Sequence, residues 1–188
     1  MRVKEYHDLL IKKHPYAESL NKKLLVDAEK LLEEQALKNE FTNVMGKRTH
    51  QIYEQSSNVQ KLVRWILDEY RYDKTVHTLS PDDEHIKKRI GCWIARYNKG
   101  EYARPHHHKP HTWSWVYFIN TPKGSSPLVF STSGKKVKAE AGKVVIFDAT
   151  VRHEVPKNKC DNRVVCAGNV TSWTEGFASP YDSATINI

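Results

Sequence analysis

The chain changes its hydrophobic periodicity once, near Pro81. Before that point, apolar residues recur at helical spacing in residues 16–37 and 59–70, which is typical of amphipathic helices that pack against a sheet. After it come short β-branched and aromatic runs separated by turn-forming segments: 90–97, 113–119, 128–131, 144–147 and 163–167. Such runs, with no helical pattern between them, favour an antiparallel sandwich or barrel. The sequence therefore predicts an α+β fold in which helices brace one face of a β unit.

Length and composition indicate one globular unit. The chain has 188 residues and a mass of 21.8 kDa, enough for one domain with a sizeable core and too few for two ordinary ones. No internal repeat divides it, so we expect a mainly helical support in residues 1–80, a β core in residues 85–170 and a C-terminal extension in residues 171–188. No apolar stretch approaches the roughly 20 residues that span a bilayer, so no membrane partner is expected.

Charge leaves one class of partner open. The 30 basic and 22 acidic residues give a net charge of +8, which favours encounter with nucleic acid or acidic partners. The basic residues are scattered, however, as on an ordinary lysine-rich surface.

Cys92, Cys160 and Cys166 are odd in number and lack CxxC spacing, so they indicate neither a disulfide framework nor a cysteine zinc site. With no signal-peptide pattern at the N-terminus, we expect a cytoplasmic protein.

Four of the ten histidines fall within six residues, between two of the predicted strands. In an extended chain, side chains at i and i+2 point to the same side, so His106 and His108 are expected to face one point while His107 faces away. His153, after the apolar run at 144–147, is the candidate third ligand. Three ligands on one face leave positions open for water, substrate or oxygen, as a catalytic metal needs.

Two other interpretations of the histidine tract stay open. A short histidine-rich segment can form an adventitious, solvated metal-binding patch. It can also serve as a pH-sensitive or nucleic-acid-contacting loop. A remote histidine with its own strand context favours the metal site over both.

The histidines belong to a series of short motifs that occur in one order from Tyr97 to Asn169. The motifs are Tyr97-Asn98-Lys99-Gly100, His106-His107-His108, Ser114-Trp115-Val116-Tyr117, Leu128-Val129-Phe130, Gly142 before an apolar strand, His153-Glu154-Val155-Pro156, and Arg163 with Asn169 six residues later. The ordered series resembles the double-stranded β-helix core of 2-oxoglutarate/iron(II) oxygenases. It is most similar to the prolyl-4-hydroxylase-like branch and to small oxygenases of phages and bacteria. The resemblance implies a jelly-roll, cupin-like core supported by the N-terminal helices.

The resemblance also implies a metal centre. It assigns iron(II) to His106, His108 and His153, with 2-oxoglutarate as co-substrate occupying two of the open positions. The most familiar family members have aspartate where this sequence has His108, so the site loses one negative charge. Asp148, five residues before His153, is the alternative source of a carboxylate.

The co-substrate needs further contacts from the protein. Its distal carboxylate requires a planar guanidinium that binds bidentately, and the resemblance assigns this role to Arg163. Prolyl-hydroxylase-like relatives often place a tyrosine beside that arginine, where this chain has Phe118. Tyr97, or less directly Ser114, is then expected to provide the hydroxyl that orients 2-oxoglutarate. Two further residues are candidates for the substrate side: Asn169 and Trp173.

These features predict a non-haem iron(II) and 2-oxoglutarate-dependent dioxygenase of hydroxylase type. It would decarboxylate 2-oxoglutarate to succinate while O2 oxidises a substrate C–H bond, with no catalytic residue beyond the metal ligands. One alternative is a three-histidine, cupin-like metalloprotein that does not use 2-oxoglutarate. Another is a basic, non-enzymatic module that binds nucleic acid. The substrate stays open among a protein side chain, a small molecule and a nucleic acid.

Overall fold

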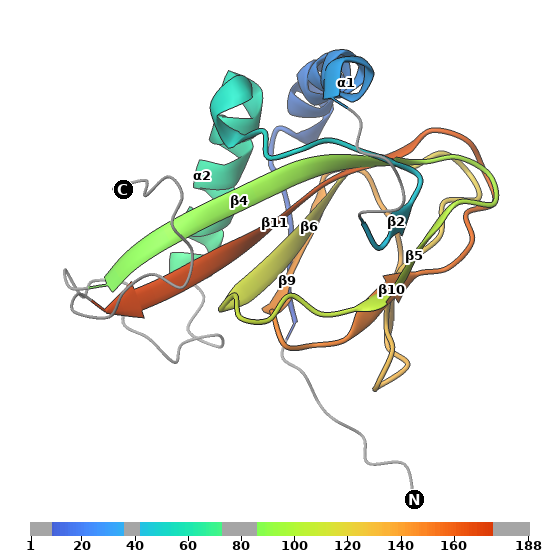
Figure 1. Cartoon of the computed structure of the whole chain (residues 1–188). Coiled ribbons are helices and arrows are strands. Elements are labelled where there is room, and N and C mark those ends of the chain that lie inside the picture. The colour runs from blue at the N-terminus through green and yellow to red at the C-terminus, as the bar shows by residue number, and fades with distance from the viewer. Residues whose placement is uncertain (1–8, 36–41, 73–85, 175–188) are drawn as a thin grey trace, which may run out of the picture.

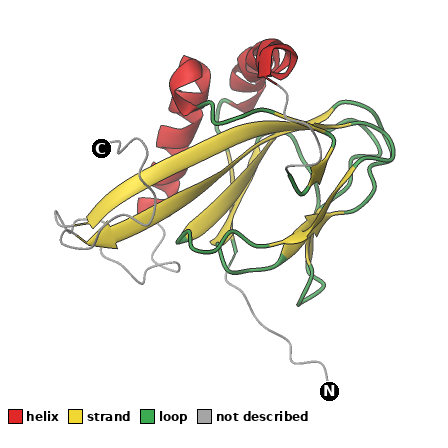
Figure 2. Ribbon diagram, in the orientation of Figure 1, coloured by secondary structure: helices red, strands yellow, loops and turns green. Residues whose placement is uncertain are grey.

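Two antiparallel β-sheets face each other, and helices cover the outer face of the larger sheet (Figure 1). The computed structural model describes residues 9–35, 42–72 and 86–174. Figure 2 separates the helical layer from the strands. This is the α+β arrangement that the change of periodicity predicts.

The larger sheet has six strands among the described residues. In spatial order they are β1 (Leu10–Lys13), β9 (Lys143–Asp148), β6 (Trp113–Asn120), β11 (Arg163–Thr174), β4 (Ile86–Tyr97) and β3 (Lys47–Arg48). Strands β4 and β11 pair along their full length, from Ile86 opposite Thr174 to Tyr97 opposite Arg163. This long pair runs across the molecule in Figure 1 and carries residues from the helix-covered region to the inter-sheet space.

The smaller sheet has five strands within the same described ranges. In order they are β2 (Val44–Met45), β5 (Tyr102–His106), β10 (His153–Val155), β7 (Leu128–Phe130) and β8 (Lys136–Val137). From β4 onward the chain passes back and forth between the sheets: β4, β6, β9 and β11 lie in the larger one, and β5, β7, β8 and β10 in the smaller one. This alternation defines a jelly roll, or double-stranded β-helix, and confirms the predicted core.

The N-terminal helices bury their apolar stripes against the larger sheet. They are α1 (Ala17–Gln35) and α2 (Ser57–Tyr72), preceded in the case of α2 by the short 3-10 helix η2 (Tyr53–Gln55). A buried amide ties α1 to β6, since Asn21 donates to the Ile119 carbonyl at 2.8 Å and accepts from the Tyr117 hydroxyl at 2.7 Å. None of the helices among the described residues is both long and apolar enough to cross a membrane.

Strand alternation divides the apolar residues between two cores. In β11, Val164 packs in the helix–sheet core and Val165 in the core between the sheets. Successive side chains of a strand point to opposite faces, so Arg163 and Asn169 share the inter-sheet side with Val165. The same rule places Trp93 of β4 between the sheets. The inter-sheet space therefore receives polar side chains from the sheet that the helices brace.

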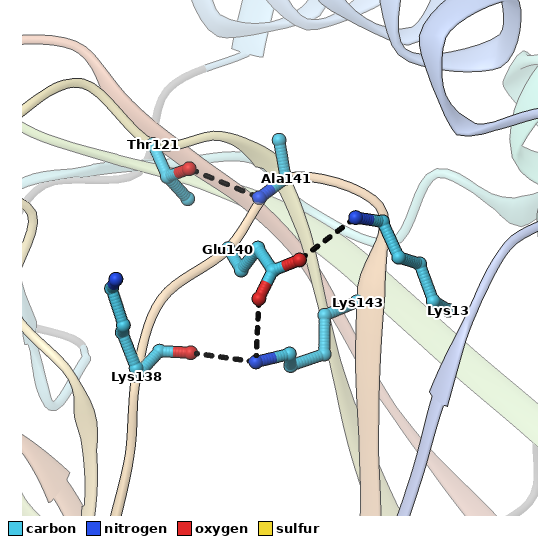
Figure 3. Close-up of polar contacts among 6 residues, drawn as sticks. All are labelled: Lys13, Thr121, Lys138, Glu140, Ala141 and Lys143. Atoms are coloured by element: carbon cyan, nitrogen blue, oxygen red, sulfur yellow. Dashed lines mark hydrogen bonds and ion pairs between the residues drawn. The ribbon is translucent and has the colours of Figure 1, made fainter.

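The N-terminal part also contributes strands that its helical pattern does not reveal. β1 has four residues and pairs with β9, starting with Leu10 opposite Ile146. An exposed ion-pair cluster follows this pairing: Glu140 accepts from Lys13 at 2.8 Å and from Lys143 at 3.0 Å (Figure 3). These ammonium groups hold the Glu140 pKa at about 2, but solvent screens such exposed pairs, so they stabilise the fold little.

Candidate metal centre

Three histidines meet between the two sheets. His106 ends β5 and His153 begins β10, and the antiparallel register sets these residues opposite each other. His108 follows in the next loop, where its N–H donates to the Ala149 carbonyl at 2.7 Å. One ring nitrogen of each histidine lies within 4.8 Å of those of the other two, and the ring centroids are 4.3 to 5.1 Å apart. The structure therefore gathers the three imidazoles into one cluster.

Backbone carbonyls fix the tautomers of two of these rings. The Nδ1 atom of His106 lies 2.7 Å from the Arg104 carbonyl, and that of His153 lies 2.9 Å from the Val151 carbonyl. Because a carbonyl oxygen only accepts, each Nδ1 must carry the hydrogen, and Nε2 keeps a free lone pair. Histidines that bind metal characteristically donate their other N–H in this way. Both rings are thus prepared to bind through Nε2.

Burial keeps the cluster uncharged. Desolvation is the largest effect on all three imidazoles: it lowers the pKa of His106, brings that of His108 to about 2 and brings that of His153 to about 3. Repulsion between neighbouring imidazolium charges adds to the decrease. Neutral imidazole is the form that binds a metal, so no proton has to leave these rings near neutral pH.

Two neighbours of the cluster point elsewhere. His107 is exposed, and its Nδ1 accepts from the Lys109 N–H at 3.2 Å. Asp148 is also exposed, and its carboxylate accepts from the Thr150 N–H at 2.7 Å. Neither belongs to the group of described residues that could hold a metal ion. The donor set of that group is therefore three imidazoles.

Arg163, the first residue of β11, is a buried cation without an acidic partner in the part of the chain that the structure describes. Its side chain is 0% exposed, and Nε donates to the Ser126 carbonyl at 3.1 Å. Both terminal nitrogens, Nη1 and Nη2, lack a hydrogen-bond partner among the described residues. The guanidinium lies over the rings of Tyr97 and Phe118, with centroids 5.0 and 5.4 Å away. A buried charge left this way is costly, and a bidentate carboxylate would satisfy it.

One cavity joins the arginine to the histidines. The histidine cluster and Arg163 line it together with mostly apolar residues, and the described lining contains no carboxylate. The lining residues that matter for the chemistry are His106, His108, His153, Arg163, Tyr97 and Trp93. A cavity with neutral imidazoles at one place and a guanidinium at another suits a ligand that binds a metal and carries a distal negative charge.

The remaining candidate residues have different surroundings. Tyr97 lines the cavity, and burial is the main cause that raises its pKa. Ser114 is buried, and its hydroxyl donates to the Asn169 side-chain oxygen at 2.8 Å. The Asn169 amide nitrogen in turn faces His108 Nδ1 at 3.4 Å. Trp173 falls in β11, but its side chain lies outside the described residues.

Sequence reasoning did not identify three further residues that lie in or beside the cavity. Trp93 lies 5.7 Å from His108 between ring centroids, and the Arg48 guanidinium lies 4.3 Å from the Trp93 ring centre. Asn43 also lines the cavity, and its buried side-chain nitrogen has no hydrogen-bond partner among the residues that the structure describes. Arg48 and Asn43 come from the two-residue strand β3 and the segment before β2. Segments this short leave no periodic signal.

The fold and the site together define a class, the double-stranded β-helix proteins that present a histidine cluster between their sheets. The sequence itself matches no family model and no curated protein. Among solved structures, similar folds occur in a 2-oxoglutarate/iron(II) oxygenase family member and in prolyl hydroxylases. At identities below 20% this likeness concerns the fold.

Three neighbours illustrate the likeness. A prolyl-4-hydroxylase from Pseudomonas putida has a TM-score of 0.67 and 17% identity, covering 88% of this chain and 92% of its own. A viral collagen prolyl hydroxylase from Paramecium bursaria Chlorella virus-1, in complex with 2-oxoglutarate, has a TM-score of 0.60 and 16% identity, with coverages of 88% and 96%. HygX from Streptomyces hygroscopicus, with nickel, 2-oxoglutarate and hygromycin B bound, has a TM-score of 0.64 and 11% identity, with coverages of 91% and 84%.

Proposed function

We propose that this protein is a non-haem iron(II) and 2-oxoglutarate-dependent dioxygenase of hydroxylase type. The observation that carries the proposal is Arg163, a buried guanidinium in the same cavity as three neutral imidazoles, whose two terminal nitrogens have no hydrogen-bond partner within the described ranges. The distal carboxylate of 2-oxoglutarate fits this requirement in charge and in shape. The 2-oxoglutarate seen in the viral prolyl hydroxylase and in HygX supports it at the level of the fold.

The donor set also fits iron(II). His106, His108 and His153 would hold the ion, since imidazole suits iron and the cluster leaves other positions open. When bound, iron(II) supplies the activation of O2, coupled to decarboxylation of 2-oxoglutarate to succinate and oxidation of a substrate C–H bond. Because the imidazoles carry no charge and the distal carboxylate would pair with Arg163, the centre would hold one negative charge fewer than a centre with a carboxylate ligand.

The chain's own residues have defined tasks in this function. Arg163 binds and orients the co-substrate, and Tyr97, beneath the guanidinium, lines the same part of the cavity. Much of the cavity wall is apolar, and surroundings of low polarity strengthen each charge interaction inside. Since no proton must be moved by a side chain, the described lining needs no general acid or base, and it contains no carboxylate.

An anaerobic titration tests the proposal. Iron(II)-loaded protein is titrated with 2-oxoglutarate while the visible charge-transfer absorption of the chelate is recorded, and succinate is then measured after O2 is admitted. Truncating one partner of a buried charge pair costs several kcal/mol, so we expect Arg163→Met to weaken 2-oxoglutarate binding by about 100-fold. The matched control is Arg152→Met, because Arg152 is exposed and bonds only the Pro105 carbonyl among the described residues.

The same titration separates the alternative functions. An unchanged affinity in Arg163→Met would favour a three-histidine metalloprotein that binds its substrate without 2-oxoglutarate, a reading that the carboxylate-free donor set also supports. Nucleic-acid binding that is steeply salt-dependent and indifferent to metal would favour the basic module. The substrate is a protein side chain, a small molecule or a nucleic acid, and Asn169 and Trp173 are proposed for its side of the cavity.

A further inference from the structure

Within the described part of the chain, the side chain of one histidine in the cluster, His108, lacks the backbone carbonyl partner that the other two have. His106 and His153 each hold Nδ1 against a carbonyl two residues earlier in the chain. The Nδ1 atom of His108 faces the side-chain amide of Asn169 instead, at 3.4 Å. The tautomer of His108 therefore depends on a side chain from a distant strand, 61 residues along the sequence.

Asn169 is itself held by a second side chain. It lies opposite Ser114 in the pairing of β11 with β6, and the Ser114 hydroxyl donates to its oxygen at 2.8 Å. The two residues are 7% and 1% exposed, so water does not compete for their hydrogen bonds. The register of the larger sheet thus fixes a chain of contacts from Ser114 through Asn169 to His108.

These contacts can satisfy either tautomer of the His108 imidazole. In the arrangement described, the Asn169 amide nitrogen can donate to an unprotonated Nδ1. A half-turn of the amide presents its oxygen instead, which accepts from a protonated Nδ1, and the Ser114 hydroxyl can donate or accept in response. The second arrangement leaves the lone pair on Nε2, as in His106 and His153. Only that arrangement lets all three rings bind through the same atom.

We propose that Ser114 and Asn169 are positioning residues that hold His108 in its metal-binding tautomer, with the Asn169 oxygen accepting from Nδ1–H. The inference deepens the proposed function, since it rests on the three histidines holding a metal. It follows from the residue at position 108. An imidazole binds through one nitrogen and needs its other N–H satisfied, whereas a carboxylate offers two equivalent oxygens and needs no tautomer. A chain with histidine here requires a partner that an aspartate would not require.

Metal affinity provides the test, measured on the full chain with Co(II) and without 2-oxoglutarate. Loss of an outer hydrogen-bond partner typically weakens metal binding by about 10–100-fold, which we expect for Asn169→Leu, together with a changed Co(II) absorption spectrum. Asn169→Asp should keep the affinity, because its carboxylate still accepts from Nδ1–H. Thr171→Val is the matched control, since it removes the 2.6 Å contact to His111, a histidine outside the cluster.

A double-mutant cycle separates positioning from general damage to the fold. With His108→Asp as background, Asn169→Leu should no longer change Co(II) affinity, because the carboxylate has no tautomer to hold. Equal losses in both backgrounds, or an Asn169→Asp variant as weak as Asn169→Leu, would overturn the proposal. Should Asn169→Leu not fold, Asn169→Ser takes its place in the cycle. The measurement is independent of 2-oxoglutarate, so failure of the Arg163 titration would leave this result standing.

Discussion

Arg163 lowers the folding stability of the ligand-free protein while it prepares the cavity to bind a carboxylate. Its guanidinium is fully buried, yet only Nε has a hydrogen-bond partner among the described residues. The rings of Tyr97 and Phe118 beneath it recover part of the lost solvation through cation–π contact. Unsatisfied buried groups of this kind cluster at functional sites, where a ligand completes them.

The first prediction follows from these two opposing effects. Replacing the guanidinium in Arg163→Met removes a buried charge and two unsatisfied donors but leaves the Ser126 carbonyl without its donor, so we expect a net gain of about 1 kcal/mol in the ligand-free protein. Thermal melts with and without 2-oxoglutarate and metal check this. The ligand should raise the melting temperature of the wild type and not that of the variant. A ligand-free variant that is markedly less stable than the wild type would show that Arg163 is structural.

At the scale of elements, the central strands β4, β6 and β11 leave no room for a side chain at Gly168. A Cβ atom added there would lie 2.5 Å from the Trp115 ring and 2.7 Å from the Gly91 carbonyl. The ring therefore packs directly over the backbone of β11, in the middle of its pairing with β4 and β6. No side chain fits at this position unless the tryptophan or the strand moves.

We therefore expect Gly168→Ala to destabilise the sheet by about 1–3 kcal/mol, the usual cost of overpacking a core. Denaturant unfolding followed by tryptophan fluorescence measures the effect. Gly134→Ala is the control: it also changes a glycine, at a turn with a φ of 73°, but an added Cβ there meets nothing within 4 Å. Its left-handed backbone should cost it about 1–2 kcal/mol, and Gly168→Ala, where the added Cβ overlaps the Trp115 ring, should lose more. Equal losses in both variants would contradict the packing argument.

The strands differ in how clearly their local sequences predict them. β6 and β9 are mostly apolar and are buried on both faces, so their local pattern predicts them. The strands that carry His106 and His153 are short and polar: β5 reads YARPH and β10 reads HEV. What places His153 opposite His106 is the pairing of these strands, a tertiary contact that no local pattern contains. The spacing at 106–108 and the ordered motifs therefore predicted the histidine cluster, whereas β1 and the Arg48–Trp93 contact left no signal.

For the whole molecule, the histidine cluster makes stability depend on pH. Burial lowers the pKa of His106, brings that of His108 to about 2 and brings that of His153 to about 3. It also lowers the pKa of His14, which packs against Trp65. In the unfolded chain a histidine takes up a proton near pH 6.5. Below that pH the unfolded state binds more protons than the folded state, so stability falls as pH falls.

We expect the free energy of unfolding of the metal-free protein to decrease steadily from pH 7 toward pH 5, with each histidine contributing up to about 1.4 kcal/mol per pH unit. The decrease should continue toward the low folded-state pKa values of His108 and His153, rather than level off just below pH 6. Denaturant unfolding at several pH values measures the slope. His108→Asn removes one of the titrating imidazoles and should flatten the slope by about one proton. A stability that does not vary over this range would mean that the three rings are not held neutral by burial, and the cluster would then lack the form in which imidazoles bind metal.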